Sequence, residues 1–207
     1  MAEVYLRRLS RWQAEQQRNS VADVYAGTYR GVAGAAHGDR QIFLRRLEQH
    51  VQHTGFDMVV ADSGGTVGCA YGFRVPSSGE WCSGLRGALP TDVEELTASG
   101  RTFLLAELMV LPAHRRRGIA TRMAEQLLIR LDADLVVAAT DGSGGGPGNA
   151  AEETFRAWGW SMSRAGVSAT GPAAGSGADA LSGTGGDTGG TGPSVTPRRM
   201  WIRRPLR

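Results

Sequence analysis

The segment from Thr102 to Leu131 places an apolar strand, a short turn and an amphipathic helix in direct succession. The strand reads TFLLAELMVL and ends before Pro112. The helix that follows has apolar residues at helical spacing. Between the two elements stand three consecutive arginines and a glycine, residues 115–118. A buried strand that leads directly into a core-facing helix is typical of α/β architecture and constrains everything else in the chain.

Three arginines at the start of a helix are unfavourable on their own, because the helix dipole is positive at that end. The first backbone N–H groups of a helix have no partner inside the helix, and together they form an anion site. Gly118 has no side chain to block the approach of an anion, and Ala120 keeps the next turn open. Arginine is suited to bidentate contacts with phosphate. The pattern predicts a pyrophosphate site, although this helix opens with neither a GxxxxGK[ST] motif nor a GxGxxG motif.

The rest of the chain alternates between strand and helix patterns. Strands are predicted at 3–9, 56–62, 66–75, 102–111 and 134–139, and helices at 12–29, 91–99, 119–131 and 149–159. A further helix is predicted to begin after Asp39, as its cap, and to end near Gly55. This order predicts an α/β (α+β) fold with a central mixed β-sheet flanked by helices on both faces.

Composition divides the chain into three parts. Residues 1–164 carry the periodic patterns of a folded domain. Residues 165–196 are almost entirely Gly, Ser, Thr and Ala, so they bury too little apolar surface to offset the entropy of ordering, and we expect a disordered insertion. In residues 197–207, Met200 and Ile202 alternate with Trp201 and Arg203, which favours a final strand over the alternative of a basic tail.

The formal charge of +3 comes from the C-terminus. All 23 basic residues are arginines, and five of them lie in the last ten residues; without those five, 18 arginines face 20 acidic residues. The body of the chain therefore does not indicate a nucleic-acid binder. No signal peptide and no run of about 18 apolar residues is visible, so we expect a cytoplasmic protein without a membrane partner.

No metal site is expected. Two cysteines, Cys69 and Cys82, are too few for a disulfide framework or a four-ligand zinc site, and Cys69 lies in an apolar run typical of a core. His50 and His53 have helical i, i+3 spacing, but no third ligand is evident. We interpret this pair as part of a solvated helix face.

The segment Arg115-Arg116-Arg117-Gly118-Ile119-Ala120, after Val110-Leu111-Pro112, resembles the cofactor motif of the GNAT acetyltransferase superfamily, Gln/Arg-x-x-Gly-x-Gly/Ala. The sequence FRAWGW about forty residues later and the strand pair before the cofactor strand are also similar to that family. The resemblance covers roughly residues 5–160 and implies acetyl-CoA as co-substrate. It further implies that the backbone of the cofactor strand pairs with the pantetheine arm, that the N–H of Val110 polarises the thioester carbonyl, and that the amides from Arg116 to Thr121 hold the pyrophosphate. The cofactor-binding residues implied are Leu108, Met109, Val110, Arg115, Arg116, Arg117, Gly118, Ile119, Ala120 and Thr121.

The resemblance implies an acyl-CoA-dependent N-acetyltransferase in which a primary amine of a small molecule or peptide attacks the thioester directly. Glu107 on the cofactor strand is the candidate base, and the alternative is a carboxylate satisfied by a neighbouring arginine or by solvent. The tyrosine that often protonates the leaving thiolate in this family is replaced by Phe155, which leaves the acid unassigned.

The acceptor is expected to enter between the first two helices and the loop at 76–100. Tyr25, Tyr29 and Trp81 are candidates to line its path, although ordinary packing in the core or at the surface is the more common role for such residues. A homodimer is possible. Two other functions stay open: a GNAT-fold module that binds acyl-CoA without turnover, and a nucleic-acid binder that uses residues 115–117 and the C-terminal arginines, which the charge of the body disfavours.

Overall fold

The computed structural model describes residues 3–30, 39–76, 91–141, 150–162 and 198–204, and its centre is one seven-stranded sheet in the order β1-β2-β3-β4-β5-β7-β6. The strands are β1 (Tyr5–Leu9), β2 (Asp57–Asp62), β3 (Thr66–Arg74), β4 (Thr102–Val110), β5 (Leu135–Asp141), β6 (Ser161–Met162) and β7 (Arg198–Arg203). The helices are α1 (Arg11–Gln16), α2 (Arg18–Tyr29), α3 (Arg40–Val51), α4 (Thr91–Ala98), α5 (Ile119–Leu128) and α6 (Ala150–Ala157), with a short 3-10 turn, η2 (Pro112–His114), before α5.

The sheet is mixed, as the sequence predicts. Neighbouring strands are antiparallel except for β4 and β5, which run parallel and are joined through α5. A parallel pair requires a crossover connection, and the amphipathic helix after the arginines provides it. The predicted α/β (α+β) fold with helices on both faces of the sheet is confirmed.

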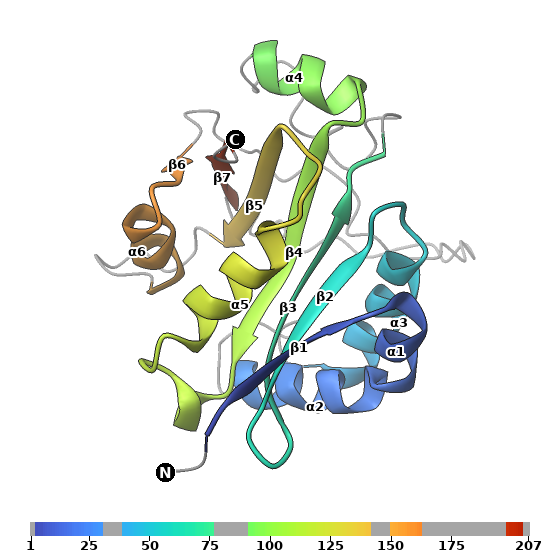
Figure 1. The fold of residues 1–207 in the computed structure, drawn as a ribbon, viewed down its shortest axis with the longest axis vertical. Helices are drawn as coiled ribbons and strands as arrows, with labels where there is room; N and C mark the ends of the chain where they lie inside the picture. The colour runs from blue at the N-terminus through green and yellow to red at the C-terminus, as the bar shows by residue number, and fades with distance from the viewer. Residues whose placement is uncertain (1–2, 31–38, 77–90, 142–149, 163–197, 205–207) are drawn as a thin grey trace, which may run out of the picture.

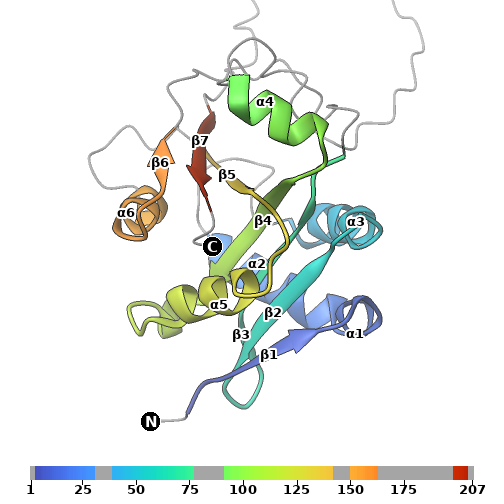
Figure 2. The ribbon, with the colours of Figure 1, turned by 45° about the horizontal axis from the view of Figure 1, so that its top comes forward.

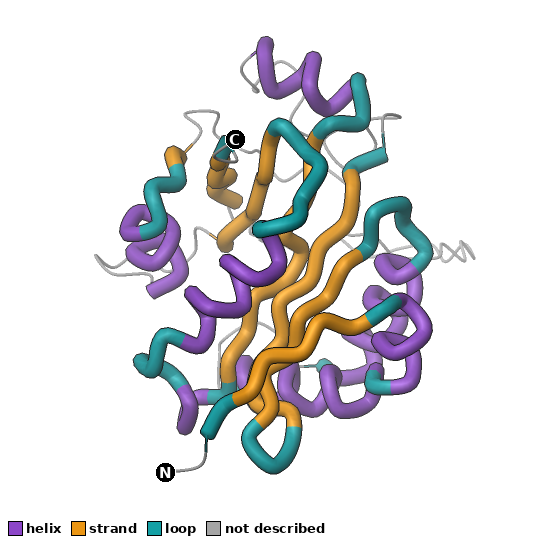
Figure 3. The backbone as a smooth tube through the Cα atoms, in the orientation of Figure 1, coloured by secondary structure: helices purple, strands orange, loops and turns teal. Residues whose placement is uncertain are grey.

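Helices cover the two faces of the sheet unequally (Figures 1 and 3). On one face, α5 and α6 pack over a core that includes Met123, Leu127 and Phe155. On the other face, α1, α2 and α3 enclose a second core that includes Phe43, Leu47 and Tyr71. Helix α4 lies at one end of the sheet over β5 and β7 (Figure 2). The sheet therefore separates two compartments, and Leu111, just beyond the end of β4, packs against both.

The helix predicted over 12–29 is two helices. Ser10 caps α1 in a capping box with Gln13, and α1 ends at Gln16. Gln17 then takes a non-helical conformation (φ −96°, ψ 7°), and α2 begins at Arg18. The break lets α1 pack near β1 and β2 while α2 crosses β3 and β4. No glycine or proline marks the position, so the periodic pattern alone predicts one helix.

The centre of the sheet opens between β4 and β5. Their pairing ends at Leu105 and Ala138 within the part of the chain that the structure describes, and β5 continues beside β7 instead. Strand β4 runs on toward the start of α5 while β5 turns away from it (Figure 1). On its other side β4 stays paired with β3, with one extra residue, Ala106, between the pairs Tyr71–Glu107 and Gly72–Leu105. This bulge and the divergence leave one edge of β4 open from Ala106 to Val110.

Strand β7 returns the chain to the sheet between β5 and β6. The side chain of Trp201 is buried, and its Nε1 donates to Thr140 Oγ1 at 3.1 Å. The expected insertion at 165–196 lies outside the described residues. Among the described helices, none is both long enough and apolar enough to cross a bilayer.

Candidate functional site

The open edge of β4 presents backbone groups in a fixed order. The N–H of Leu111 donates to Val67 O at 2.9 Å, which directs residue 111 toward β3. Backbone groups alternate in direction along a strand, so Met109 also faces β3, while the N–H groups of Leu108 and Val110 face the open side. Of the three cofactor residues expected on this strand, Met109 is the one whose backbone groups face away from the open edge. Its backbone belongs to the β3 ladder, and its side chain is buried under α2 and α3.

The loop from β4 to α5 is shaped by two residues with positive φ. Arg116 has φ 63° and Gly118 has φ 69° and ψ 7°, and Gly118 is the N-cap of α5. A non-glycine residue with positive φ is uncommon and costs about 1 kcal/mol. Among the residues that the structure describes, no side chain caps the helix, and its first turn holds no acidic residue. The amides at the start of α5 therefore depend on solvent or a ligand for partners.

The space beside Gly118 is open. A Cβ built at this residue meets no heavy atom of the described residues within 4 Å. Ala120 and Thr121 on the next turn are half-buried, and Thr121 Oγ1 accepts a hydrogen bond from Trp158 Nε1 at 3.2 Å. The cradle that the sequence predicts, an uncapped helix start beside a glycine, is thus flanked on one side by the end of α6.

The three arginines of the motif do different things. The guanidinium groups of Arg116 and Arg117 are exposed and make no hydrogen bond or ion pair to any described residue. In contrast, Arg115 donates from Nε to Val110 O and from Nη2 to Thr28 O, both at 3.1 Å. Two arginines are therefore available to an anion, while the third joins the end of β4 to the end of α2.

The side of the sheet that faces α2 and α3 carries the candidate base. The carboxylate of Glu107 pairs with the Arg46 guanidinium, and the Glu107 side chain is only 10% exposed. The guanidinium lies 5.4 Å from the ring centroid of Tyr25 and 5.6 Å from that of Phe43, within range of cation–π attraction. Of the two possibilities that the sequence leaves for Glu107, contact with a neighbouring arginine is present in the structure.

Two of the three predicted acceptor residues, Tyr25 and Tyr29, lie in the described part of the chain. Tyr25 and Tyr29 are neighbours on α2, with ring centroids 4.7 Å apart. Tyr25 is buried near Arg46, and Tyr29 is half-buried at the end of the helix. Trp81 lies outside the described residues. The structure therefore brings Tyr25 to the Glu107 side of the sheet, with Tyr29 next to it.

Burial and charge shift several pKa values around this ion pair. Burial alone would lower the pKa of Arg46, but the charge of Glu107 and the two nearby tyrosines raise it above its ordinary value. Burial and the Glu107 charge raise the pKa of the Tyr71 hydroxyl well above its usual range. Burial, Arg46 and His53 together lower the pKa of His50 to about 4. The cluster thus holds a charged guanidinium, a neutral phenol and a neutral imidazole at pH 7.

The interpretation of His50 and His53 as a solvated face is wrong. His50 Nδ1 lies 3.2 Å from the Tyr71 hydroxyl, and the His50 ring is 4.7 Å from that of Phe73. The His53 ring stacks on the same Phe73 at 4.3 Å. Both histidines pack against β3, His50 from the last turn of α3 and His53 from just beyond the end of the helix at Val51, which i, i+3 spacing alone does not reveal. Among the described residues, no group of three or more potential metal ligands occurs.

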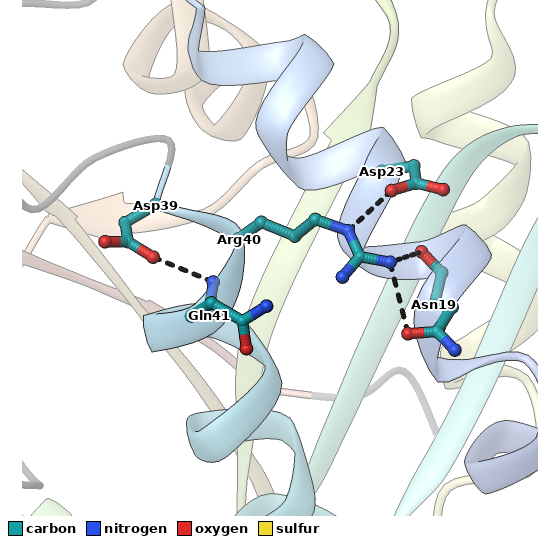
Figure 4. Close-up of polar contacts among 5 residues, drawn as sticks. All are labelled: Asn19, Asp23, Asp39, Arg40 and Gln41. Carbon is teal, nitrogen blue, oxygen red and sulfur yellow. Dashed lines mark hydrogen bonds and ion pairs between the residues drawn. The ribbon is translucent and has the colours of Figure 1, made fainter.

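Arg40 fixes the relative position of α2 and α3 (Figure 4). Its Nε donates to Asp23 at 2.6 Å, and its Nη2 donates to the Asn19 side chain at 3.1 Å. Asp39 accepts from the amides of Gln41 and Ile42, which begins α3 as the sequence predicts. Arg46 lies six residues further along the same helix, where it contacts Glu107.

Sequence reasoning missed Arg46 and Tyr71, and it placed His50 on a solvated helix face. Arg46 is one of 23 arginines, and its partner lies 61 residues away along the chain. The one available signal was Glu107 itself, since a carboxylate in an apolar strand requires a cationic or hydrogen-bonding partner.

The general acid is also absent at the position where the family often has a tyrosine. Phe155 is buried, with its ring 4.8 Å from that of Trp160 and 5.7 Å from that of Trp201. It belongs to the apolar core under α6.

Comparison with known proteins agrees with this geometry. The family model described as acetyltransferase (GNAT) family matches residues 18–141, which is more than half of the chain. The chain belongs to the GNAT acetyltransferase family. GNAT enzymes use acetyl-CoA, so the co-substrate expected from the sequence is confirmed, and the chain is an acetyltransferase by family. No curated protein matches the chain.

Several solved GNAT-fold structures are similar to the whole chain. An N-acetyltransferase from Staphylococcus aureus Mu50 is 11% identical, with a TM-score of 0.58 over 98% of this chain and 99% of that one. Diaminobutyrate acetyltransferase EctA from Paenibacillus lautus, in complex with L-2,4-diaminobutyric acid and coenzyme A, is 14% identical, with a TM-score of 0.52 over 99% and 96%. A chain of the NatC complex bound to Gag peptide and CoA is 12% identical, with a TM-score of 0.56 over 99% of both. At these identities the likeness shows the fold.

Proposed function

We propose that this protein transfers the acetyl group of acetyl-CoA to a primary amine of a small molecule or peptide, by direct attack of the amine on the thioester. The observation that carries the proposal is the continuity of β4. One strand offers Glu107 toward α2 and α3, the N–H of Val110 at its open edge, and the Gly118 cradle just beyond its end.

Acetyl-CoA supplies an activated thioester, whose diphosphate fits the start of α5. The amides there and the exposed guanidinium groups of Arg116 and Arg117 form the anion site. The N–H groups of Leu108 and Val110 can pair with an extended ligand arm as an added strand would. The N–H of Val110 is also the donor that can stabilise negative charge on the carbonyl oxygen during attack.

Glu107 receives the proton of the attacking amine, directly or through water. An alkyl ammonium has a pKa near 10.4, so its deprotonation at pH 7 costs roughly 4–5 kcal/mol. The Arg46 guanidinium contacts the Glu107 carboxylate and fixes its direction, so the carboxylate is already oriented when the amine arrives. The amine nitrogen bonds to the carbonyl carbon, the carbon–sulfur bond breaks, and the thiolate leaves. A thiol pKa near 8.5 makes this departure possible without a tyrosine at position 155.

The acceptor enters on the α2 and α3 side, where Tyr25 and Tyr29 lie. Tyr25 is buried beside Arg46, so the half-buried Tyr29 is the ring of this pair that can contact an aminoalkyl group, whose carbons and charge an aromatic ring attracts. Two of the similar structures hold a diamino acid and a peptide, respectively. These represent the two acceptor classes of the proposal.

The experiment is a panel of small amines and short peptides, assayed by thiol release from acetyl-CoA. At least one acceptor should support turnover by the wild-type protein. With that acceptor, Glu107→Gln should lower kcat about 100-fold, since loss of a general base costs about 10²–10⁴. Glu48→Gln, which changes an exposed glutamate on α3, is the matched control and should leave kcat unchanged. Wild-type turnover by Glu107→Gln would remove Glu107 as the base.

A second candidate function is an acyl-CoA-binding module without turnover. Two observations favour it: the buried Phe155 provides no acid, and Glu107 is already paired with Arg46. This function predicts that acetyl-CoA binds while no member of the panel releases thiol.

A further inference from the structure

We propose that Arg115 is a positioning residue that ties the end of the acceptor-side helix α2 to the Val110 peptide, and that it does not bind the diphosphate. This inference rests on the proposed function for its catalytic consequence. It gives the first arginine of the motif a role different from those of Arg116 and Arg117.

The geometry of the guanidinium carries the first step. Arginine grips a phosphate or carboxylate best through two parallel N–H bonds from one edge of its plane. In Arg115 the edge formed by Nε and Nη2 is already used, with Nε on Val110 O and Nη2 on Thr28 O. Both acceptors are main-chain carbonyls of this protein. A diphosphate could take this edge only by breaking both bonds.

The two carbonyls belong to elements that meet closely at this point. Thr28 lies in the last turn of α2, where the final carbonyls of a helix have no partner inside the helix. One residue earlier, Gly27 lies so close to Leu111 that an added Cβ would stand 2.7 Å from Leu111 Cδ2. Arg115 therefore crosses a tight junction between α2 and the end of β4 and satisfies a carbonyl on each side.

The junction links the two halves of the site. Tyr25 and Tyr29 lie on the same end of α2, on the acceptor side. The N–H of Val110 faces the open edge, where the thioester is expected, and its carbonyl is held by Arg115. Removal of the clamp frees both the last turn of α2 and the orientation of Val110. The chemical step should suffer while the diphosphate cradle stays intact.

Hydrogen exchange of the free protein tests the clamp without any ligand. Arg115→Met keeps an unbranched, mostly apolar stem but removes the guanidinium donors, and Arg116→Met is the matched control. Amides 27–29 should exchange about tenfold faster in Arg115→Met than in the wild type, because the last turn frays. They should be unchanged in Arg116→Met. Equal exchange in Arg115→Met and the wild type would overturn the clamp.

Kinetics with two thioesters test whether Arg115 positions Val110 or binds the diphosphate. Acetyl-CoA carries the diphosphate, and acetyl-pantetheine lacks it. With the best amine of the panel, Arg115→Met should lower kcat about tenfold or more for both thioesters, with a KM for acetyl-CoA within about threefold of wild type. Arg116→Met should raise the KM for acetyl-CoA only. The proposal fails if Arg115→Met raises only that KM and behaves like wild type with acetyl-pantetheine, because it would then be a diphosphate ligand.

The two proposals fail differently. If the wild-type protein releases no thiol with any amine, the proposed function fails. The exchange rates of amides 27–29 still decide whether Arg115 joins α2 to β4.

Discussion

At the scale of single residues, the contact between Arg46 and Glu107 is the feature that most changes the account of the site. A mostly buried ion pair gains little net stability, because the cost of desolvating both charges offsets their attraction. Removal of one partner is costly, because the other charge is left buried alone. The pair is better explained by the position it gives the carboxylate than by its contribution to folding.

His50 makes a prediction about stability and pH. In the folded protein its pKa is about 4, because of burial and the positive charge of Arg46, with His53 contributing; Tyr71 faces the same ring. In the unfolded chain a histidine has a pKa near 6.5. The folded state therefore binds fewer protons between these values, and stability falls as the pH drops from about 6.5 to about 4.

Urea unfolding at pH 7 and pH 5 measures this effect. His50 should account for about 1–2 kcal/mol of the stability lost between the two pH values, discounted for its partial exposure. In His50→Gln, the stability lost between pH 7 and pH 5 should be smaller by about 1–2 kcal/mol. In His114→Gln, which changes the half-buried histidine of η2, the loss should equal that of the wild type. The same loss in His50→Gln and the wild type would show that His50 is not a buried neutral group.

At the scale of elements, the bulge in β4 sets the direction of Glu107. The extra residue, Ala106, lies opposite the step from Tyr71 to Gly72 on β3. Gly72 has no room for a side chain: a Cβ there would collide with the carbonyl oxygen of Leu104 and with the Phe103 ring. The glycine is required by the close approach of the two strands at the bulge.

Gly72→Ala should therefore destabilise the protein by at least about 2 kcal/mol, as overpacking of a rigid site does. Gly68→Ala, on the same strand, is the graded comparison. Its Cβ would lie 3.1 Å from Met109 O and 3.1 Å from Met123 Cε, which a small shift relieves, so its cost should be smaller. Chemical denaturation measures both values. The account of the bulge is wrong if Gly72→Ala unfolds at the same denaturant concentration as Gly68→Ala.

Elements with a strong pattern could be predicted from the sequence, and departures from regular geometry could not. The alternating and helical patterns give β2, β3, β4 and α5 nearly to their ends. The break at Gln17 and the bulge at Ala106 arise from packing between distant segments, and neither residue type signals them. The divergence of β4 from β5 is likewise a property of the sheet. The same holds for the site. The anion site beside Gly118 could be predicted because its residues are consecutive in the sequence, whereas the contact of Arg46 with Glu107 could not, because it depends on the tertiary structure.

At the scale of the whole molecule, β4 lies between the two compartments on either side of the sheet. In the proposed function, the start of α5 and the open strand edge are the cofactor side, and α2 and α3 are the acceptor side. The cofactor side is a local sequence motif, which explains why the family is evident at low identity to the similar structures. The acceptor side is built from contacts between helices that the motif does not include.

Calorimetric titration with acetyl-CoA tests the central claim, that the co-substrate binds at the start of α5 beside Gly118. Gly118→Glu places a carboxylate where the diphosphate should lie and should weaken binding at least about tenfold, equivalent to about 1.4 kcal/mol. Gly100→Glu is the matched control, because Gly100 has nearly the same φ (70° against 69°) and equally open space, but lies between α4 and β4. The account predicts wild-type affinity for Gly100→Glu and a large loss for Gly118→Glu, and equal affinity in all three proteins would contradict it.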